Sequence, residues 1–269
     1  MAITATINVK DQDLLGSLQT FCTAILARED IRAILVPQRH PMKSMVMPTL
    51  VTDPEQLDGI DPLSPAFPMN GAKVLAKLTR KPSGGKIAAL LRPCEIRAFI
   101  ELVKLKQART EDVVLMGIDC LGALRNTDYF RFAGSDAAAA TQRFYEGMLA
   151  GKEAALDGVE LAAACKSCEH SIPDAADIAV GLWGVDIGTG ILAQAQSPAG
   201  EALLAQLNLP AAEAPKARED ALARLLEART ASRDQMFAEM AAATDSVEKL
   251  SNYMANCVNC YNCRVACPV

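Results

Sequence analysis

Aromatic residues and histidines are scarce in this chain. Phe, Tyr and Trp make up 4% of the 269 residues, and His occurs twice. So few aromatic side chains do not supply the base-stacking platforms of proteins that bind single-stranded nucleic acid. The two histidines, His40 and His170, belong to neither a Ser–His–Asp pattern nor an H-E-x-x-H motif. We therefore expect ordinary surface or core histidines and no hydrolytic chemistry.

The chain also lacks an excess of positive charge and any long apolar run. Lys and Arg number 27 against 32 Asp and Glu, a formal net charge of −5, whereas nucleic-acid binding usually needs a basic stripe. No apolar stretch reaches the roughly 18–20 residues of a membrane-spanning helix. The N-terminal sequence MAITATINVK lacks the basic and apolar regions of a signal peptide. We expect a cytoplasmic protein, either soluble or peripheral in a complex.

Apolar runs alternate with helical patterns along the first part of the chain. The continuously apolar runs 86–91 and 112–118 are typical of strands buried within a parallel sheet. A helical pattern lies between them, an order that favours an α/β domain with right-handed crossovers. The other predicted strands are 3–9, 31–37 and 45–51, and Pro48 places the last of them at an edge of the sheet. The predicted helices are 14–25, 70–81, 96–103 and 136–149, and Asn70 is the expected N-cap of the second.

The last third of the chain changes in composition. A short apolar run at 175–181 leads into a loop bearing glycines up to Gly190, and a long helix is predicted over 216–242. Along this helix an apolar stripe is formed by Leu222, Leu225, Leu226, Phe237 and Met240. Such a stripe is typical of a helix that packs on its own domain, and a helix that binds a partner protein is the alternative.

The predicted fold class is therefore α/β, with a mixed or mainly parallel sheet core and a C-terminal helical segment. The chain ends in a short tail, and the cysteine motif described below makes it a ferredoxin-like cluster-binding tail. The predicted parts are an α/β domain at 1–200, a helical segment at 201–255 and the tail at 256–269.

Nine cysteines are the most informative residues in the sequence. Cytoplasmic thiols stay reduced, so a disulfide framework is not expected. The cysteines are then either small core residues or metal ligands. Cys22 falls on the apolar face of the helix 14–25 and is expected in the core, while the other eight fall in two patterned sets.

The first set forms the tail motif C-x2-C-x2-C-x3-C-P, which consists of Cys257, Cys260, Cys263 and Cys267 followed by Pro268. This is the spacing of bacterial ferredoxins, in which the fourth cysteine ligates the other cluster of a two-cluster protein. A zinc ribbon would instead use two C-x2-C pairs with a longer spacer. The motif predicts a 4Fe–4S cluster, with zinc or structural thiols as the alternatives.

The second set is dispersed. Cys94 and Cys120 each follow a predicted buried strand, and Cys165 and Cys168 form a C-x2-C pair. Ligands of open α/β sheets bind beyond the carboxyl ends of the strands, so these thiols are able to converge on a second 4Fe–4S cluster there. The alternative is that Cys94 and Cys120 are core residues and that the C-x2-C pair is a redox or zinc knuckle.

Two clusters in one small chain suggest an electron relay that ends at a two-electron carrier such as a flavin. The sequence contains no G-x-G-x-x-G fingerprint, and the stretch 184–190 does not fit it. A standard dinucleotide-binding fold is therefore not indicated by a motif.

The motifs resemble a known family. Residues 92–102 (RPCEIRAFIEL), 116–120 (MGIDC), 165–173 (CKSCEHSIP) and the cysteine tail resemble the coenzyme F420 hydrogenase/dehydrogenase beta-subunit family, and most closely its formate dehydrogenase beta subunits. The stretch 68–73 (PMNGAK) resembles the family's P-x-N-x-x-K step. Two features differ: residues 14–17 (LLGS) stand where family members often have Cys-Gly-Gly, and family tails commonly continue with C-x-C-x2-C. One hypothesis is a selenocysteine codon read as a stop after Val269, which sequencing of the gene beyond that codon tests.

The resemblance implies a flavoprotein with FAD and two 4Fe–4S clusters, which passes electrons between a catalytic partner subunit and a flavin that exchanges hydride with a soluble deazaflavin. The implied partners are redox subunits of formate dehydrogenase, hydrogenase or heterodisulfide-reductase type. The implied cluster ligands are Cys94, Cys120, Cys165, Cys168 and the four tail cysteines, and the implied flavin-binding residues are Asn70, Gly71, Lys73, Trp183 and Gly184. An exposed helix lysine is the alternative for Lys73, and a core tryptophan is the alternative for Trp183. A flavin-free iron–sulfur relay or docking subunit and a zinc-stabilised interaction protein are the alternative functions.

Overall fold

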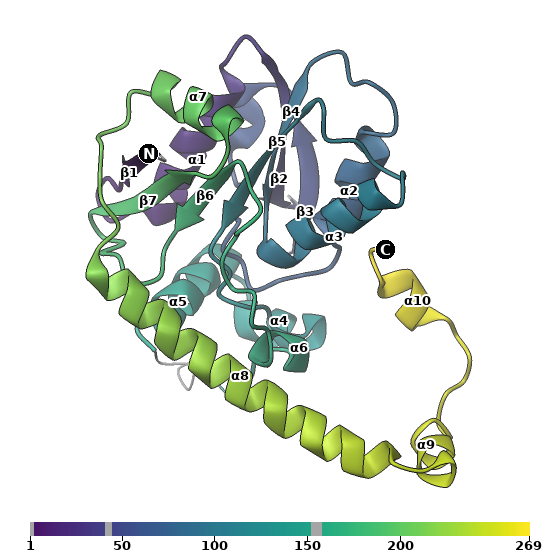
Figure 1. Cartoon of the computed structure of the whole chain (residues 1–269). Coiled ribbons are helices and arrows are strands. Elements are labelled where there is room, and N and C mark those ends of the chain that lie inside the picture. The colour runs from purple at the N-terminus through teal and green to yellow at the C-terminus, as the bar shows by residue number, and fades with distance from the viewer. Residues whose placement is uncertain (1–2, 41–44, 152–157) are drawn as a thin grey trace.

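Four parallel strands form the centre of the molecule. The computed structural model describes residues 3–40, 45–151 and 158–269. Its single seven-stranded sheet has the order β1-β7-β6-β5-β4-β2-β3 (Figure 1). The neighbours within β2, β4, β5 and β6 pair in parallel, and these strands span Ile31–Arg39, Lys86–Leu91, Val113–Ile118 and Ile178–Gly181. Their near-continuous apolar sequences fit a sheet that is covered on both faces.

Antiparallel strands close both edges of the sheet. On one side β7 (Gly190–Ala195) pairs with β6, and β1 (Thr4–Asn8) pairs with β7. On the other side β3 (Val46–Val51) pairs with β2, and Pro48 lies opposite Pro37. Because proline has no N–H to donate, this edge position for Pro48 agrees with the prediction. The predicted fold class, an α/β fold with a mainly parallel core, is confirmed.

Helices cover both faces of the sheet and create two separate cores. Alternate residues of β4 point to opposite faces: Ala88 and Leu90 join the larger core, whereas Ala89 and Leu91 join the smaller one. The smaller core lies under α2 (Gly71–Leu78) and α3 (Pro93–Lys104). The larger core receives residues from α1 (Leu14–Leu26), α4 (Asn126–Ala133), α5 (Ala137–Leu149) and α7 (Pro198–Gln206) and from the short 3-10 helix η1 (Pro54–Leu57).

Most predicted elements are found, but some bounds differ and the structure has further elements. The helix predicted over 70–81 begins at Gly71, capped by the Asn70 side chain, but ends at Leu78 because Thr79 leaves the helical conformation. The predicted glycine loop ends at Gly190, where β7 begins. Neither β7 nor α4 and α7 was predicted. The helix α7 spans the predicted boundary at 200/201, and the three-part division of the chain stays a prediction.

The longest helix, α8 (Lys216–Thr244), extends beyond the sheet (Figure 1). Leu222 and Leu225 pack against the larger core, but Leu226 and Phe237 are 49% and 59% exposed. The expectation of an ordinary packing stripe is therefore wrong for Leu226 and Phe237. The physical reason is that α8 contacts the domain along one face, on which Arg218, Leu225 and Arg229 recur at helical spacing, and Leu226 and Phe237 lie outside that face.

The tail returns toward the domain after α8. The helices α9 (Val247–Tyr253) and α10 (Asn262–Ala266) follow α8, and the chain ends near α3 (Figure 1). The Lys73 Nζ on α2 donates a hydrogen bond to the Val265 carbonyl of α10. Among the helices that the structure describes, none is both long and apolar enough to cross a membrane.

Candidate metal centre

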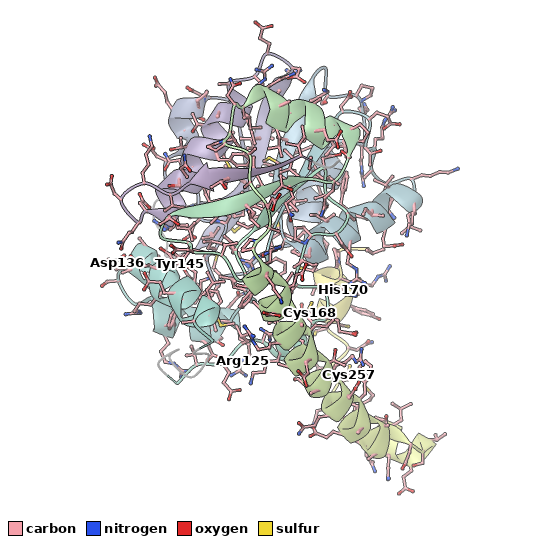
Figure 2. The ribbon with its side chains drawn as sticks, turned by 60° about the vertical axis from the view of Figure 1, so that its left-hand side comes forward. Arg125, Asp136, Tyr145, Cys168, His170 and Cys257 are labelled. Carbon is pink, nitrogen blue, oxygen red and sulfur yellow. The ribbon has the colours of Figure 1, made fainter. Side chains whose placement is uncertain are left out.

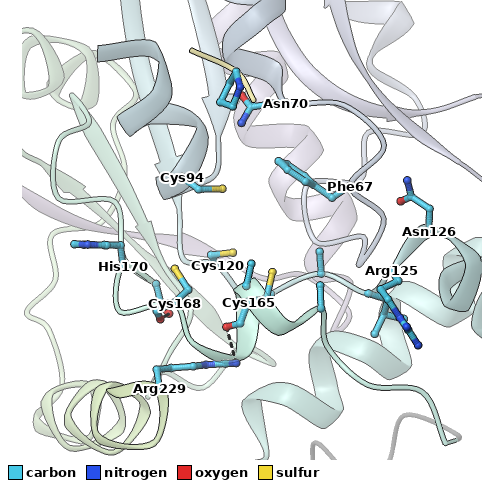
Figure 3. A pocket seen from close by; sticks show the side chains of 17 residues that line it. Phe67, Asn70, Cys94, Cys120, Arg125, Asn126, Cys165, Cys168, His170 and Arg229 are labelled. Carbon is cyan, nitrogen blue, oxygen red and sulfur yellow. Dashed lines mark hydrogen bonds between the residues drawn. The ribbon is translucent and has the colours of Figure 1, made fainter. Parts of the chain in front are cut away.

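A cavity of about 620 Å³ opens beyond the carboxyl ends of β4 and β5. All four dispersed cysteines line it: Cys94, Cys120, Cys165 and Cys168. Figure 3 shows their thiols gathered around one space. The predicted convergence of Cys94 and Cys120 follows from the parallel pairing of β4 with β5, which brings the ends of the two strands side by side.

Local backbone structure positions the first two thiols. Cys94 is the second residue of α3, directly after Pro93, and proline is well suited to the first helical position. The Glu95 carboxylate accepts hydrogen bonds from the backbone N–H of Arg92 at 2.9 Å and of Gly71 at 2.6 Å, which ties the start of α3 to the start of α2. The backbone N–H of Cys120 donates to the Ser171 carbonyl at 2.8 Å, which joins the end of β5 to the segment that follows Cys168.

The helix α8 holds the C-x2-C segment in place. Cys165 lies on the short helix α6 (Ala163–Lys166), and its carbonyl accepts a hydrogen bond from Arg229 Nη1 at 2.7 Å. One turn further along α8, Arg233 forms an ion pair with Glu169, the residue after Cys168. Figure 2 shows Cys168 and His170 beside α8. The C-x2-C segment is therefore supported from a helix that begins some 50 residues later in the sequence.

A buried ion pair attaches α8 to the sheet. The Arg218 guanidinium contacts both carboxylate oxygens of Asp119, at 2.6 and 3.1 Å. Asp119 also accepts hydrogen bonds from the backbone N–H of Leu182 and Trp183. Since Asp119 precedes Cys120, the same carboxylate links β5, the end of β6 and the first turn of α8.

The thiols are disfavoured as free thiolates in this cavity. Burial raises the pKa of Cys94 to about 12 and also raises the pKa of Cys120, and the nearby Arg92 guanidinium lowers both values only in part. The accessible surface of Cys94 faces the cavity, which this residue lines. A metal centre is the natural group to hold such thiols deprotonated, because metal ligation replaces the proton.

The donor set fits an iron–sulfur cluster. Four soft thiol ligands on one cavity suit such a cluster. Among the described residues, no three His, Cys, Asp or Glu side chains are close enough together to hold a single metal ion.

The tail cysteines lie outside this cavity. Cys257, Cys260, Cys263 and Cys267 are all exposed, and the last two flank or lie within α10. Pro268 nevertheless lines the cavity, and Val265 contacts Lys73. The structure therefore brings the tail to the mouth of the cavity, while the ligand role of its thiols stays a prediction.

The five predicted flavin-binding residues separate into two groups. Asn70 lines the cavity, the Gly71 N–H is bonded to Glu95, and Lys73 is half-buried against the tail. Trp183 instead lies in the larger core, where its buried Nε1 has no hydrogen-bond partner among the described residues. Gly184 lines a second pocket of about 450 Å³. The flavin assignment of all five stays a prediction.

Three further residues differ in how well the sequence predicts their positions: Cys22, Arg92 and Arg229. Cys22 is completely buried in the larger core, as predicted, and burial raises its pKa to about 12. The sequence patterns predict no role for Arg92 or Arg229, but both are buried in the structure. Arg229 lines the cavity, and Arg92 lines a small cleft together with Cys120. Arg92 stands directly before Pro93 and Cys94, so its position was visible in the motif, whereas nothing in the Ala/Arg/Glu-rich sequence of α8 distinguishes Arg229.

The curated proteins that this chain resembles include two formate dehydrogenase subunits. The chain is 25% identical over 275 residues to the F420-dependent formate dehydrogenase subunit beta of Methanocaldococcus jannaschii, covering 94% of this chain and 72% of that protein. It is 25% identical over 253 residues to the F420-dependent formate dehydrogenase 1 subunit beta of Methanococcus maripaludis, covering 83% of this chain and 63% of that protein. The chain thus spans about two thirds of the length of these relatives. No family model matches the chain.

A solved structure shares the fold. A chain of the F420-reducing [NiFe] hydrogenase complex from Methanosarcina barkeri matches with a TM-score of 0.63 and 14% identity, over 92% of this chain and 94% of that one. The two curated relatives are oxidoreductase subunits, in line with the predicted class. The resemblance to the F420 beta-subunit family, which the cysteine motifs predicted, is confirmed by these relatives.

Proposed function

We propose that the chain is an electron-transfer oxidoreductase subunit with two 4Fe–4S clusters and FAD. The observation that supports this most directly is the convergence of Cys94, Cys120, Cys165 and Cys168 on one cavity. These thiols come from three separate segments of the chain, and their common position is explained by a shared ligand. The function of the curated relatives, which are F420-dependent formate dehydrogenase subunits, points in the same direction.

The protein's own residues would hold the centre and shield it. Cys94, Cys120, Cys165 and Cys168 are the proposed ligands. Arg229 and Ser171 hold the backbone of the ligand segments through carbonyl hydrogen bonds. Phe67, Leu124 and Ala164 line the cavity beside the thiols and exclude water. Burial of this kind, together with hydrogen bonds around the sulfurs, is what sets the reduction potential of a cluster.

The tail would provide a second ligand set, Cys257, Cys260, Cys263 and Cys267. Its return to the cavity mouth through Pro268 supports an electron path between the two sets. A bound cluster supplies one-electron transfer, and a bound flavin couples this to the exchange of a hydride. The proposed partners are a catalytic redox subunit and a soluble carrier such as a deazaflavin. Asn70 and Lys73, near the cavity and the tail, are the better supported of the proposed flavin-binding residues.

An absorption spectrum of anaerobically purified protein, recorded before and after dithionite, tests this proposal. We expect a broad cluster absorption that bleaches on reduction, with flavin bands above it. A chain that stays colourless after reconstitution with iron and sulfide would contradict the proposal.

The ligand assignment is tested by Cys120→Ala, with Cys22→Ala as the matched control. Both variants remove one thiol, but Cys22 is buried in the larger core, whereas the half-buried Cys120 lines the cavity. We expect Cys120→Ala to lose about half of the bound iron and acid-labile sulfide, and Cys22→Ala to keep the wild-type content. Equal iron content in the two variants would remove Cys120 from the ligand set.

A flavin-free relay subunit is the second candidate. It is favoured by the position of Trp183 and Gly184, which lie away from the cysteine cavity. Release of FAD from denatured protein, measured by its fluorescence, separates the two candidates.

A further inference from the structure

Arg92 places a buried positive charge beside the cysteine cavity. Its side chain is only 7% exposed. Its Nη2 donates to the carbonyls of Ser64 at 2.5 Å and of Ala66 at 3.1 Å, and the guanidinium lies 5.0 Å from the centre of the Phe67 ring. These contacts hold the guanidinium rigidly, but carbonyl groups and an aromatic ring carry no net charge and do not neutralise it.

The carboxylates around Arg92 are engaged elsewhere. Glu95, three residues along α3, accepts hydrogen bonds from two backbone N–H groups, one from Arg92 and one from Gly71. Asp119 lines the same small cleft as Arg92, but it forms a bidentate ion pair with Arg218. The Arg92 guanidinium donates its hydrogen bonds to carbonyls and not to these carboxylates, so its charge also acts on its other neighbours.

Those neighbours are two of the proposed cluster ligands. Arg92 comes two residues before Cys94, it lines a small cleft together with Cys120, and the Phe67 ring on which it stacks lines the main cavity. In a protein interior, a unit charge acts strongly on other charges at such short range. Reduction of a cluster with four thiolate ligands adds one negative charge, so a nearby cation favours the reduced state.

We propose that Arg92 raises the reduction potential of the centre held by Cys94, Cys120, Cys165 and Cys168. Arg92 acts through its fixed charge, as an electrostatic tuning residue outside the ligand set. This inference rests on the proposed function, because it requires a cluster in the cavity.

The test is a potentiometric titration of the full chain, followed by electron paramagnetic resonance. Cys260→Ala and Cys263→Ala are introduced throughout, so that only the cavity centre contributes to the signal. Arg92→Met and Arg92→Gln remove the charge, Arg92→Lys keeps it, and Arg97→Met removes an exposed arginine from the same helix as a control.

We expect the two neutral variants to change the ratio of reduced to oxidised centre about tenfold at a fixed potential. For one electron this equals a shift of about 59 mV to more negative values. Arg92→Lys and Arg97→Met should stay close to the parent, because one keeps the buried charge and the other removes a charge that water screens.

Each other outcome is decisive. An unchanged potential in Arg92→Met and Arg92→Gln, with the centre intact, overturns the role of Arg92 and leaves the proposed function standing. Absence of a centre from the unsubstituted chain overturns the proposed function itself. Both neutral variants can also lose the centre altogether. In that case, a centre that is retained in Arg92→Lys supports the need for a positive charge at this position. Loss of the centre in Arg92→Lys as well overturns the proposal, because the carbonyl hydrogen bonds of Arg92 and not its charge are then what the centre requires.

Discussion

At the scale of single residues, the same side chain has three different environments in this protein. Cys22 is a sealed core residue, Cys94 lies on the wall of a cavity, and the tail cysteine Cys260 is exposed to solvent. A thiol must be both deprotonated and accessible in order to react or to bind a metal. The environments therefore predict different chemistry for residues that look alike in the sequence.

Alkylation of the metal-free chain separates these environments. We expect iodoacetamide at pH 8 to modify the exposed tail cysteines well before Cys94 and Cys22, because burial raises the pKa of both to about 12. Raising the pH toward 10 should speed the modification of Cys94, which has an open cavity beside it, but not that of sealed Cys22. Peptide mass spectrometry over time measures the order. Early modification of Cys94 at pH 8 would contradict this view of the cavity.

At the scale of elements, α8 is attached by its first turn and supports the C-x2-C segment further along. The attachment depends on Arg218, which pairs with Asp119, and on Gly184, whose φ of +70° suits glycine. A Cβ on Gly184 would lie 2.4 Å from the Arg218 Cα, so a side chain there would push α8 away from the sheet.

Removal of the Arg218 side chain should destabilise the protein strongly. Arg218→Ala leaves the buried carboxylate of Asp119 without its charged partner, and breaking such a pair costs about 3–5 kcal/mol. Urea denaturation measures the loss in free energy of unfolding. The exposed Arg224→Ala on the same helix serves as the control and should change it by less than about 0.5 kcal/mol. A similar small effect for both variants would show that the ion pair does not anchor α8.

The close approach at Gly184 gives a second test of the same junction. Gly184→Ala combines an unfavourable backbone conformation with a backbone clash. Gly59 also has a positive φ, of +80°, but a Cβ there would meet open space, so Gly59→Ala carries only the conformational cost of about 1–2 kcal/mol. We expect a clearly larger fall in melting temperature for Gly184→Ala. Equal melting temperatures for the two variants would argue against a tight junction.

At the scale of the whole molecule, the tail returns to the cavity of the dispersed cysteines. Pro268 lines the cavity of the dispersed set although the tail motif belongs to the other end of the chain, beyond α8 and α9. The proposed function requires electron exchange between the two cysteine sets, and this position of Pro268 is consistent with it.

Magnetic interaction between the two proposed centres tests this arrangement. In the fully reduced chain with both centres, we expect broadened electron paramagnetic resonance signals, because nearby unpaired spins interact. Cys260→Ala combined with Cys263→Ala should leave one narrower signal. A spectrum of the full chain that equals the sum of two independent centres would place them far apart.

The sequence by itself determined the local chemistry of this protein. The apolar run 86–91 forms a buried strand, as its composition predicts. The spacing of Cys257 to Cys267 predicts a ferredoxin-like tail from the sequence alone. Cys22 was placed in the core because helical periodicity alone assigns it to the buried face. Patterns of this kind depend on neighbours within a few residues along the chain.

Only the tertiary structure decided how distant segments meet. The convergence of Cys94 and Cys120 with Cys165 depends on the strand order, which places β4 beside β5 and the C-x2-C segment under α8. The burial of Arg92 and Arg229, the exposure of Phe237 and the separation of Trp183 from the cavity are likewise results of packing. The physical reason is that charge, burial and metal ligation depend on distances in space, which residues far apart in the sequence acquire only when the sheet and α8 have formed.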